Sequence, residues 1–131
     1  MTSIKNSAAW KNFSLYIKER DGWTCIVCGR KPKERRQCHA GHFIQSEGHS
    51  ITALNEKNVN CECEQCNIYG DAETGYIYAK KLDMKWGAGT ADYLFKLSRK
   101  IVPHATPQEL KEISKIYLAK YRNLLAEKPQ I

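Results

Sequence analysis

Apolar side chains recur at helical spacing near the start of the chain. Trp10, Phe13 and Ile17 follow one another at intervals of three or four residues, with Tyr16 beside them. This spacing predicts a helix over residues 6–20, because residues three and four apart share one face of a helix. We expect the aromatic stripe to lie in the core.

The last third of the chain carries further segments with the same period. Helices are predicted over residues 76–86, 90–101 and 106–127, with Thr90 as the candidate cap of the second. The last of them begins with a capping box, Thr106 to Glu109, and has proline at its first helical position. These helices are expected to form a scaffold.

The middle of the chain has shorter apolar runs. The pattern predicts a strand over residues 37–45 and a turn over residues 46–50. A second strand over residues 51–54 is less well marked, because the polar stretch 55–60 follows it directly. The chain is therefore expected to form one α+β domain, with a small hairpin framed by helices. Its three expected parts are an N-terminal helical segment (residues 1–24), a central part with the hairpin (residues 25–75) and a set of C-terminal helices (residues 76–131).

Two Cys-x-x-Cys pairs flank this predicted hairpin. Cys25 with Cys28 and Cys63 with Cys66 have the spacing of a four-thiolate zinc site. A disulfide framework is the alternative, but the chain carries no secretory signal. Zinc binding supplies on the order of 10–16 kcal/mol to zinc-finger peptides, enough to hold a small fold together. Cys61 is a competing ligand, and Cys38 is expected to be a buried small side chain.

The chain is basic, with 21 Lys and Arg against 14 Asp and Glu and a formal net charge of +7. Such an excess favours a nucleic-acid partner, although a merely soluble basic protein is the alternative. Five basic residues follow the first cysteine pair and are candidate phosphate contacts: Arg30, Lys31, Lys33, Arg35 and Arg36. A solvated run of charge is the alternative for this loop.

No apolar run of 18 residues is present, and the N-terminus lacks the apolar stretch of a signal peptide. We therefore expect no membrane contact and a cytoplasmic location.

Two residues near the cysteine pairs suit the hydrolysis of a phosphodiester bond. That reaction needs a base to take a proton from water and a cation to offset charge on the phosphoryl and leaving oxygens. Histidine suits the first role, since its ordinary pKa is about 6.5. An oxygen ligand suits a hard ion such as Mg²⁺. His42 and Asn67 are the candidates, and a purely structural histidine is the alternative.

Five motifs follow one another between Phe13 and Asn67, within a likeness to known proteins that runs from about Trp10 to the last helix. They are Phe13-Ser14-x-Tyr16-Ile17-x-x-Arg20-Asp21, Cys25-x-x-Cys28-Gly29, Ala40-Gly41-His42-Phe43, Asn58-Val59 and Gln65-Cys66-Asn67. In this order they resemble the HNH (ββα-metal) nucleases, and more closely the phage NinG (Rap) recombination nucleases.

The resemblance implies a structural zinc and a ββα-metal motif with an N-terminal helix and about three C-terminal helices. It implies that His42 is the general base, that Asn58 braces the hairpin and that Asn67 binds a catalytic divalent ion, Mg²⁺ or Mn²⁺. The expected activity is DNA endonuclease cleavage of branched recombination intermediates, of Holliday junction or D-loop type. The products would carry 5′-phosphate and 3′-hydroxyl ends, and a phage-encoded protein would act in the cytoplasm of its bacterial host.

The chain departs from the family pattern beside the predicted base. Many HNH enzymes have an acidic ligand directly before the base, where this chain has Gly41; NinG-like sequences have Asp three residues before it, where this chain has His39. His39 could bind metal, orient His42 or bind nothing. Asp71 is a candidate extra ligand if its helix continues through Gly70.

His49 is a candidate phosphate contact or a bystander. The expected partner is DNA, with no small-molecule substrate; a homodimer would suit the cutting of two strands, but no residue requires one. Three alternatives stay open: a non-catalytic zinc module that binds DNA, a nuclease that nicks DNA without regard to branching, and a structural protein that zinc merely stabilises.

Overall fold

The structure, a computed structural model, describes residue 4 and residues 7–45, 50–100 and 104–128, without the side chains of residues 50 and 51. It is an α+β fold with a small two-stranded sheet. The elements, in chain order, are α1 (Ala8–Arg20), η2 (Arg35–Gln37), β1 (Cys38–His42), α2 (Ser50–Ala53), β2 (Val59–Cys63), α3 (Glu64–Tyr69), α4 (Ala72–Trp86), α5 (Thr90–Ser98) and α6 (Pro107–Glu127).

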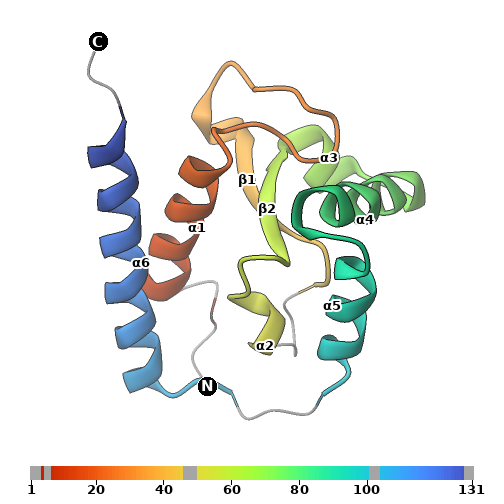
Figure 1. The fold of residues 1–131 in the computed structure, drawn as a ribbon. Coiled ribbons are helices and arrows are strands. Elements are labelled where there is room, and N and C mark those ends of the chain that lie inside the picture. Colours follow the sequence, from red (N-terminus) through yellow and green to blue (C-terminus); the bar gives the residue numbers. More distant parts are fainter. Residues whose placement is uncertain (1–3, 5–6, 46–49, 101–103, 129–131) are drawn as a thin grey trace.

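The two strands form an antiparallel pair at the centre of the molecule (Figure 1). Cys38 lies opposite Cys63 at one end, and His42 lies opposite Val59 at the other. Residues directly opposite one another share a face of the sheet. One face therefore carries Cys38, Ala40 and His42 with their partners, and the other carries His39 and Gly41 with theirs.

The second strand is not where the sequence predicted it. Residues 50–53 form the short helix α2, and the second strand begins only at Val59. All five residues of β2 are buried, including the polar Asn60 and Glu62. A strand covered on both faces shows no alternation of polar and apolar residues, which is why the polar pattern concealed it. β1 is also shorter than the predicted strand over residues 37–45.

Helix α1 covers the first face of the hairpin, and α6 lies on the outer side of α1 (Figure 1). Phe13 and Ile17 are fully buried against Val59. Tyr117 of α6 meets the ring of Phe13 edge-on, with 4.8 Å between the ring centroids. The predicted core role of the N-terminal aromatic stripe is confirmed. The observed helix begins at Ala8, where the Ser7 side chain caps it.

The second face of the hairpin lies under α4. The Tyr78 hydroxyl is buried there and donates a hydrogen bond to the Gly41 carbonyl oxygen, at 2.7 Å. Tyr78 and Leu82 of α4 and Leu94 of α5 form one apolar cluster with Cys25 and Cys63. The hairpin is thus enclosed between two helical layers.

Three of the predicted helix boundaries need correction. α4 begins at Ala72, four residues before the predicted start, and α5 ends at Ser98 rather than at residue 101, which lies outside the described residues. Thr90 was predicted as the cap of α5, but Gly89 occupies that position and Thr90 is the first helical residue. The capping box of α6 is confirmed, because Thr106 accepts from the Glu109 backbone amide and the Glu109 side chain accepts from that of Thr106.

Within the described residues, no helix combines the length and the apolar character that crossing a membrane requires.

Candidate functional site

Four cysteines from three separate segments converge on one point. Cys25 and Cys28 lie on a tight turn closed by Gly29, whose φ is 75°; Cys63 ends β2 and Cys66 lies in α3. Their four sulfur atoms all lie within 4.8 Å of one another, and Cys28 Sγ is 3.7 Å from Cys63 Sγ. Four thiolates about 2.3 Å from a tetrahedral zinc ion would lie about 3.8 Å apart. The predicted ligand set therefore fits a structural metal such as zinc.

The electrostatic surroundings of the four thiols differ. Burial alone would raise the pKa of Cys28, but hydrogen bonds, above all from the Arg30 side chain, lower it to about 6. Burial raises the pKa of Cys25 and of Cys66. Metal binding requires deprotonated thiols. Of these three thiols, Cys28 gives up its proton most readily, and Cys25 and Cys66 would lose theirs on binding a metal.

The two remaining cysteines lie outside the group of four. Cys38 and Cys61 are buried in a small cluster with Trp23, and Cys38 Sγ contacts the Trp23 carbonyl oxygen at 3.4 Å. The prediction that Cys38 is a buried small side chain is confirmed. Cys61 does not belong to the group of four, although the sequence left it as a competing ligand.

His42 lies at the end of β1 and is held on two sides. Its Nε2 is 3.0 Å from the carbonyl oxygen of Ala53, the last residue of α2. Its ring stacks on Trp10 of α1, with 5.0 Å between centroids and 15° between planes. A carbonyl oxygen only accepts hydrogen bonds, so Nε2 is the donor here. In the neutral ring the lone pair then lies on Nδ1.

Asn58 is fully buried and fixes the loop that leaves β1. Its side chain accepts from the Ile44 amide at 2.8 Å and donates to the Ile44 carbonyl at 3.0 Å. It also donates to the Thr52 carbonyl at 2.8 Å. These three bonds tie both sides of the segment between the strands to the start of β2.

The other predicted site residues belong to α3, to the start of α4 or to the part of the chain outside the described residues. Asn67 lies exposed on α3, directly after Cys66. Asp71 was a candidate ligand only if its helix continued through Gly70, and α3 ends before Gly70. Asp71 instead caps α4, where its side chain accepts from the Thr74 amide at 3.1 Å. His49 lies outside the described residues.

Glu62 is a residue that the sequence analysis did not single out. It lies opposite His39 in the strand pair and is only 4% exposed. Burial raises the pKa of its carboxyl group to about 7. His39 Nε2 is buried and has no hydrogen-bond partner among the described residues. Its place between Cys61 and Cys63 was the only signal in the sequence, and it gave no indication of burial.

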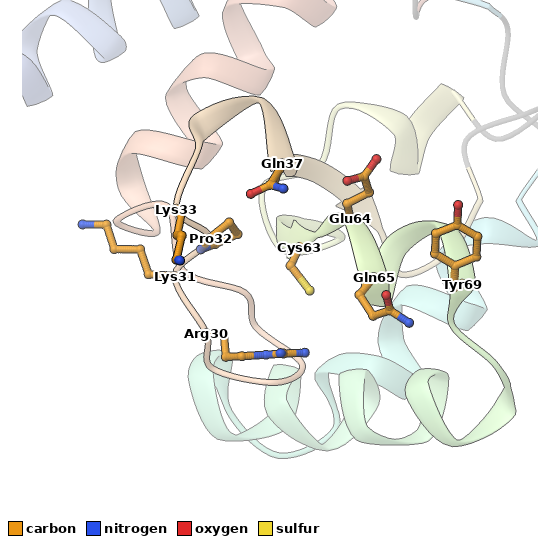
Figure 2. A pocket seen from close by; sticks show the side chains of 9 residues that line it. All are labelled: Arg30, Lys31, Pro32, Lys33, Gln37, Cys63, Glu64, Gln65 and Tyr69. Atoms are coloured by element: carbon orange, nitrogen blue, oxygen red, sulfur yellow. The ribbon is translucent and has the colours of Figure 1, made fainter.

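The basic loop borders a groove of about 410 Å³ (Figure 2). Figure 2 shows the loop on one side and α3, with Gln65 and the 70% exposed Tyr69, on the other. Of the five predicted phosphate contacts, Arg30, Lys31 and Lys33 line it. Arg35 lies 4.5 Å from the centre of the Trp23 ring and Arg36 pairs with Glu34, so these two also have structural contacts.

Comparison with known proteins gives one result. Residues 4–127 match the family described as Bacteriophage Lambda NinG protein, and neither a curated protein nor a solved structure matches the chain. The match covers both cysteine pairs, the hairpin and α6. The chain belongs to the NinG family, named for the protein of bacteriophage lambda.

Proposed function

We propose that this protein is a metal-dependent DNA endonuclease of the HNH type, acting on branched recombination intermediates. The observation that carries the proposal is the setting of His42, which is oriented by a backbone carbonyl and an aromatic ring at the end of the hairpin. Membership of a phage family with a plausible role in recombination is consistent with such a substrate.

His42 would act as the general base. Its Nε2 lies 3.0 Å from the Ala53 carbonyl oxygen, which fixes the orientation in which the ring would take a proton from a water molecule. The Trp10 ring fixes the plane of the imidazole, and Asn58 fixes the loop after it. A base held in one orientation is productive because catalysis depends on the alignment of water, base and phosphorus.

Asn67 would hold the catalytic ion. Its amide oxygen is exposed on α3 and suits Mg²⁺ or Mn²⁺, ions that keep most of their waters and bind few protein groups. When bound, the ion would offset negative charge on the phosphoryl group and on the leaving oxygen.

The groove between the basic loop and α3 would hold the DNA backbone. Lys31 and Lys33 are exposed there and suit phosphate contacts, which attract lysine regardless of base sequence. Tyr69 presents an aromatic face on which an unstacked base could rest. A branched DNA offers both backbone phosphates and unstacked bases, since its strands part at the junction.

The test compares cleavage of a four-way junction with cleavage of a linear duplex of the same sequence, in Mg²⁺ or Mn²⁺. We expect the wild-type protein to cut the junction faster, and His42→Ala to lower the rate by a factor of about 10²–10⁴, the usual contribution of a general base. His104→Ala is the matched control, because His104 is exposed and lies before α6. Equal cleavage by wild type and His42→Ala would refute the enzymatic proposal.

A non-catalytic DNA-binding module is the second candidate, and the groove favours it independently of His42. In that case the protein would bind the junction but leave it uncut with either ion. Equal cleavage of junction and duplex would instead indicate a nuclease that ignores branching.

A further inference from the structure

We propose that the groove between the starts of α1 and α6 binds an acidic peptide segment of a partner protein and seats one apolar side chain of that segment. The two helices lie side by side, and their first turns border a hollow of about 500 Å³, the α1–α6 groove (Figure 1). Concave sites of this size, mostly apolar with a few polar groups, are typical of ligand binding. The α1–α6 groove shares no residue with the groove beside the basic loop, so the proposal does not depend on the proposed nuclease activity.

The lining of the α1–α6 groove is apolar and partly made of small side chains. Ala8 and Ala9 begin α1, and Pro107 and Leu110 line the groove from the first turn of α6. Ala9 and Leu110 are buried, whereas Ala8 is exposed. Two successive alanines leave open the space that larger side chains would fill where two helices meet. The hollow therefore suits an apolar side chain from outside, which would gain free energy by leaving water.

A buried hydrogen-bonded contact holds the two walls of the groove together. Asn12 of α1 donates to the carbonyl oxygen of Ser114 at 3.1 Å and to its hydroxyl oxygen at 2.8 Å. Ser114 lines the groove. Its hydroxyl accepts from Asn12 and keeps its own proton for donation, for example to a carboxylate. The groove thus has fixed walls and a polar group at its side.

Two lysines of α6 make the edge of the groove basic. Lys111 and Lys115 both line it, are exposed and lie one helical turn apart, an arrangement in which like charges slightly destabilise a helix. Among the described residues neither lysine forms an ion pair, whereas Lys120 of the same helix pairs with Glu56. None of the described residues that line the groove is acidic. The groove is therefore complementary in charge to an acidic partner.

The spacing of these charges suits an extended peptide. Acidic side chains at alternate positions of an extended segment lie about 7 Å apart, close to the rise of about 6 Å between Lys111 and Lys115. The positive end of α1, whose first turn has no acidic residue, adds to the attraction. A nucleic-acid backbone also carries regularly spaced charges, but it brings no apolar side chain to the lining. An acidic peptide with an apolar residue satisfies both features of the groove.

The test measures binding of fluorescein-labelled decapeptides to the full chain, purified with zinc, by fluorescence anisotropy without DNA. Each peptide carries one leucine or phenylalanine between aspartates. Two matched sets replace the apolar residue with serine or the aspartates with lysines. We expect the acidic apolar peptides to bind at least tenfold more tightly than either matched set. Absence of this preference would overturn the proposal.

Variants of the two walls locate the binding. Lys111→Glu/Lys115→Glu should bind the acidic apolar peptides at least tenfold more weakly and should prefer the lysine set instead. Ala8→Leu fills the groove from an exposed position and should weaken binding although both lysines remain. Lys80→Glu/Lys81→Glu is the matched control, because it makes the same change of charge at exposed positions on α4. Circular dichroism verifies the fold of each variant, and an equal loss in the control would overturn the proposal.

Junction DNA provides the remaining comparison. Lys111→Ala/Lys115→Ala should bind the acidic peptides more weakly and bind the junction as wild type does. Peptide binding is measured without DNA, so the proposed nuclease activity can fail while this site is confirmed. A loss of junction affinity in this variant as large as that in Lys31→Ala/Lys33→Ala, with no peptide bound by wild type, would assign the groove to DNA and overturn the proposal.

Discussion

Asn58 shows how much a single polar side chain contributes to this fold. It satisfies the amide and carbonyl of Ile44 and the carbonyl of Thr52, all inside the protein. Asn58→Ala should lower the free energy of unfolding by about 3 kcal/mol, since buried backbone groups would lose their partners. Urea denaturation measures this change. The exposed Asn67→Ala should stay within about 0.5 kcal/mol of wild type.

Asp21 is the charged centre of a network that joins α1, β2 and α4. It accepts from the Arg20 guanidinium, the Lys85 ammonium and the Cys61 amide. Asp21→Asn should lower the free energy of unfolding by about 3 kcal/mol, because two partly buried cations lose their counter-charge. Thermal or urea denaturation at neutral pH measures the loss. A loss below about 0.5 kcal/mol would contradict the structural importance of the network.

Asp21 also predicts how stability depends on pH. Burial alone would raise the pKa of its carboxyl group, but the bonds from Arg20 and Lys85 together lower it below the ordinary 3.8. The unfolded chain therefore binds more protons than the folded chain near that pH, so the Asp21 contribution is complete above about pH 5 and is lost as the pH falls through the folded value. Urea midpoints between about pH 6 and pH 3 should fall less steeply for Asp21→Asn than for wild type.

At the scale of elements, the sequence predicted a helix cap and the apolar face of a helix. It did not predict which elements pack against one another. The capping box of α6 and the aromatic stripe of α1 follow from spacing alone, and both are present. The second strand escaped prediction because helices cover both of its faces, which removes the alternation on which a strand prediction depends. Glu62 is buried as well, and its charge acts on Tyr78 of α4, an element that follows it in the chain.

The cluster of four cysteines, which could hold a structural metal such as zinc, is the clearest link between elements. It ties the turn at Cys25 to the junction of β2 and α3, two places far apart in the sequence. Cys25→Ser or chelation should abolish cooperative thermal unfolding, because metal binding supplies much of the folding free energy of such small domains. Circular dichroism and measurement of bound zinc would show the loss.

Cys38→Ser is the control for this prediction. Cys38 is as buried as Cys25 but lies with Trp23 and Cys61, outside the group of four. The variant should keep one bound zinc and a cooperative transition. A folded, zinc-free Cys25→Ser protein would show that the four cysteines do not have the structural role assigned to them.

At the scale of the whole molecule, the hairpin separates two kinds of surface. The zinc cluster and the basic groove lie at the end where β2 passes into α3, whereas α6 lies beyond α1, on the outer side of the opposite layer (Figure 1). Basic residues occur in both regions, so the net charge of +7 does not by itself say which surface the proposed DNA contact would use. The groove is favoured because it adds a concave shape and an exposed aromatic ring to the charge.

That preference predicts how DNA binding responds to salt. Each phosphate contact made by a lysine adds about 0.9 to the slope of log K against log salt concentration on duplex DNA. Lys31→Ala/Lys33→Ala should therefore reduce the slope by about 1.8, measured by fluorescence anisotropy with a labelled junction. Lys111→Ala/Lys115→Ala removes the same charge from exposed positions on α6 and should leave the slope nearly unchanged. Equal reductions in both variants would mean that DNA responds to the total charge of the molecule and not to the groove.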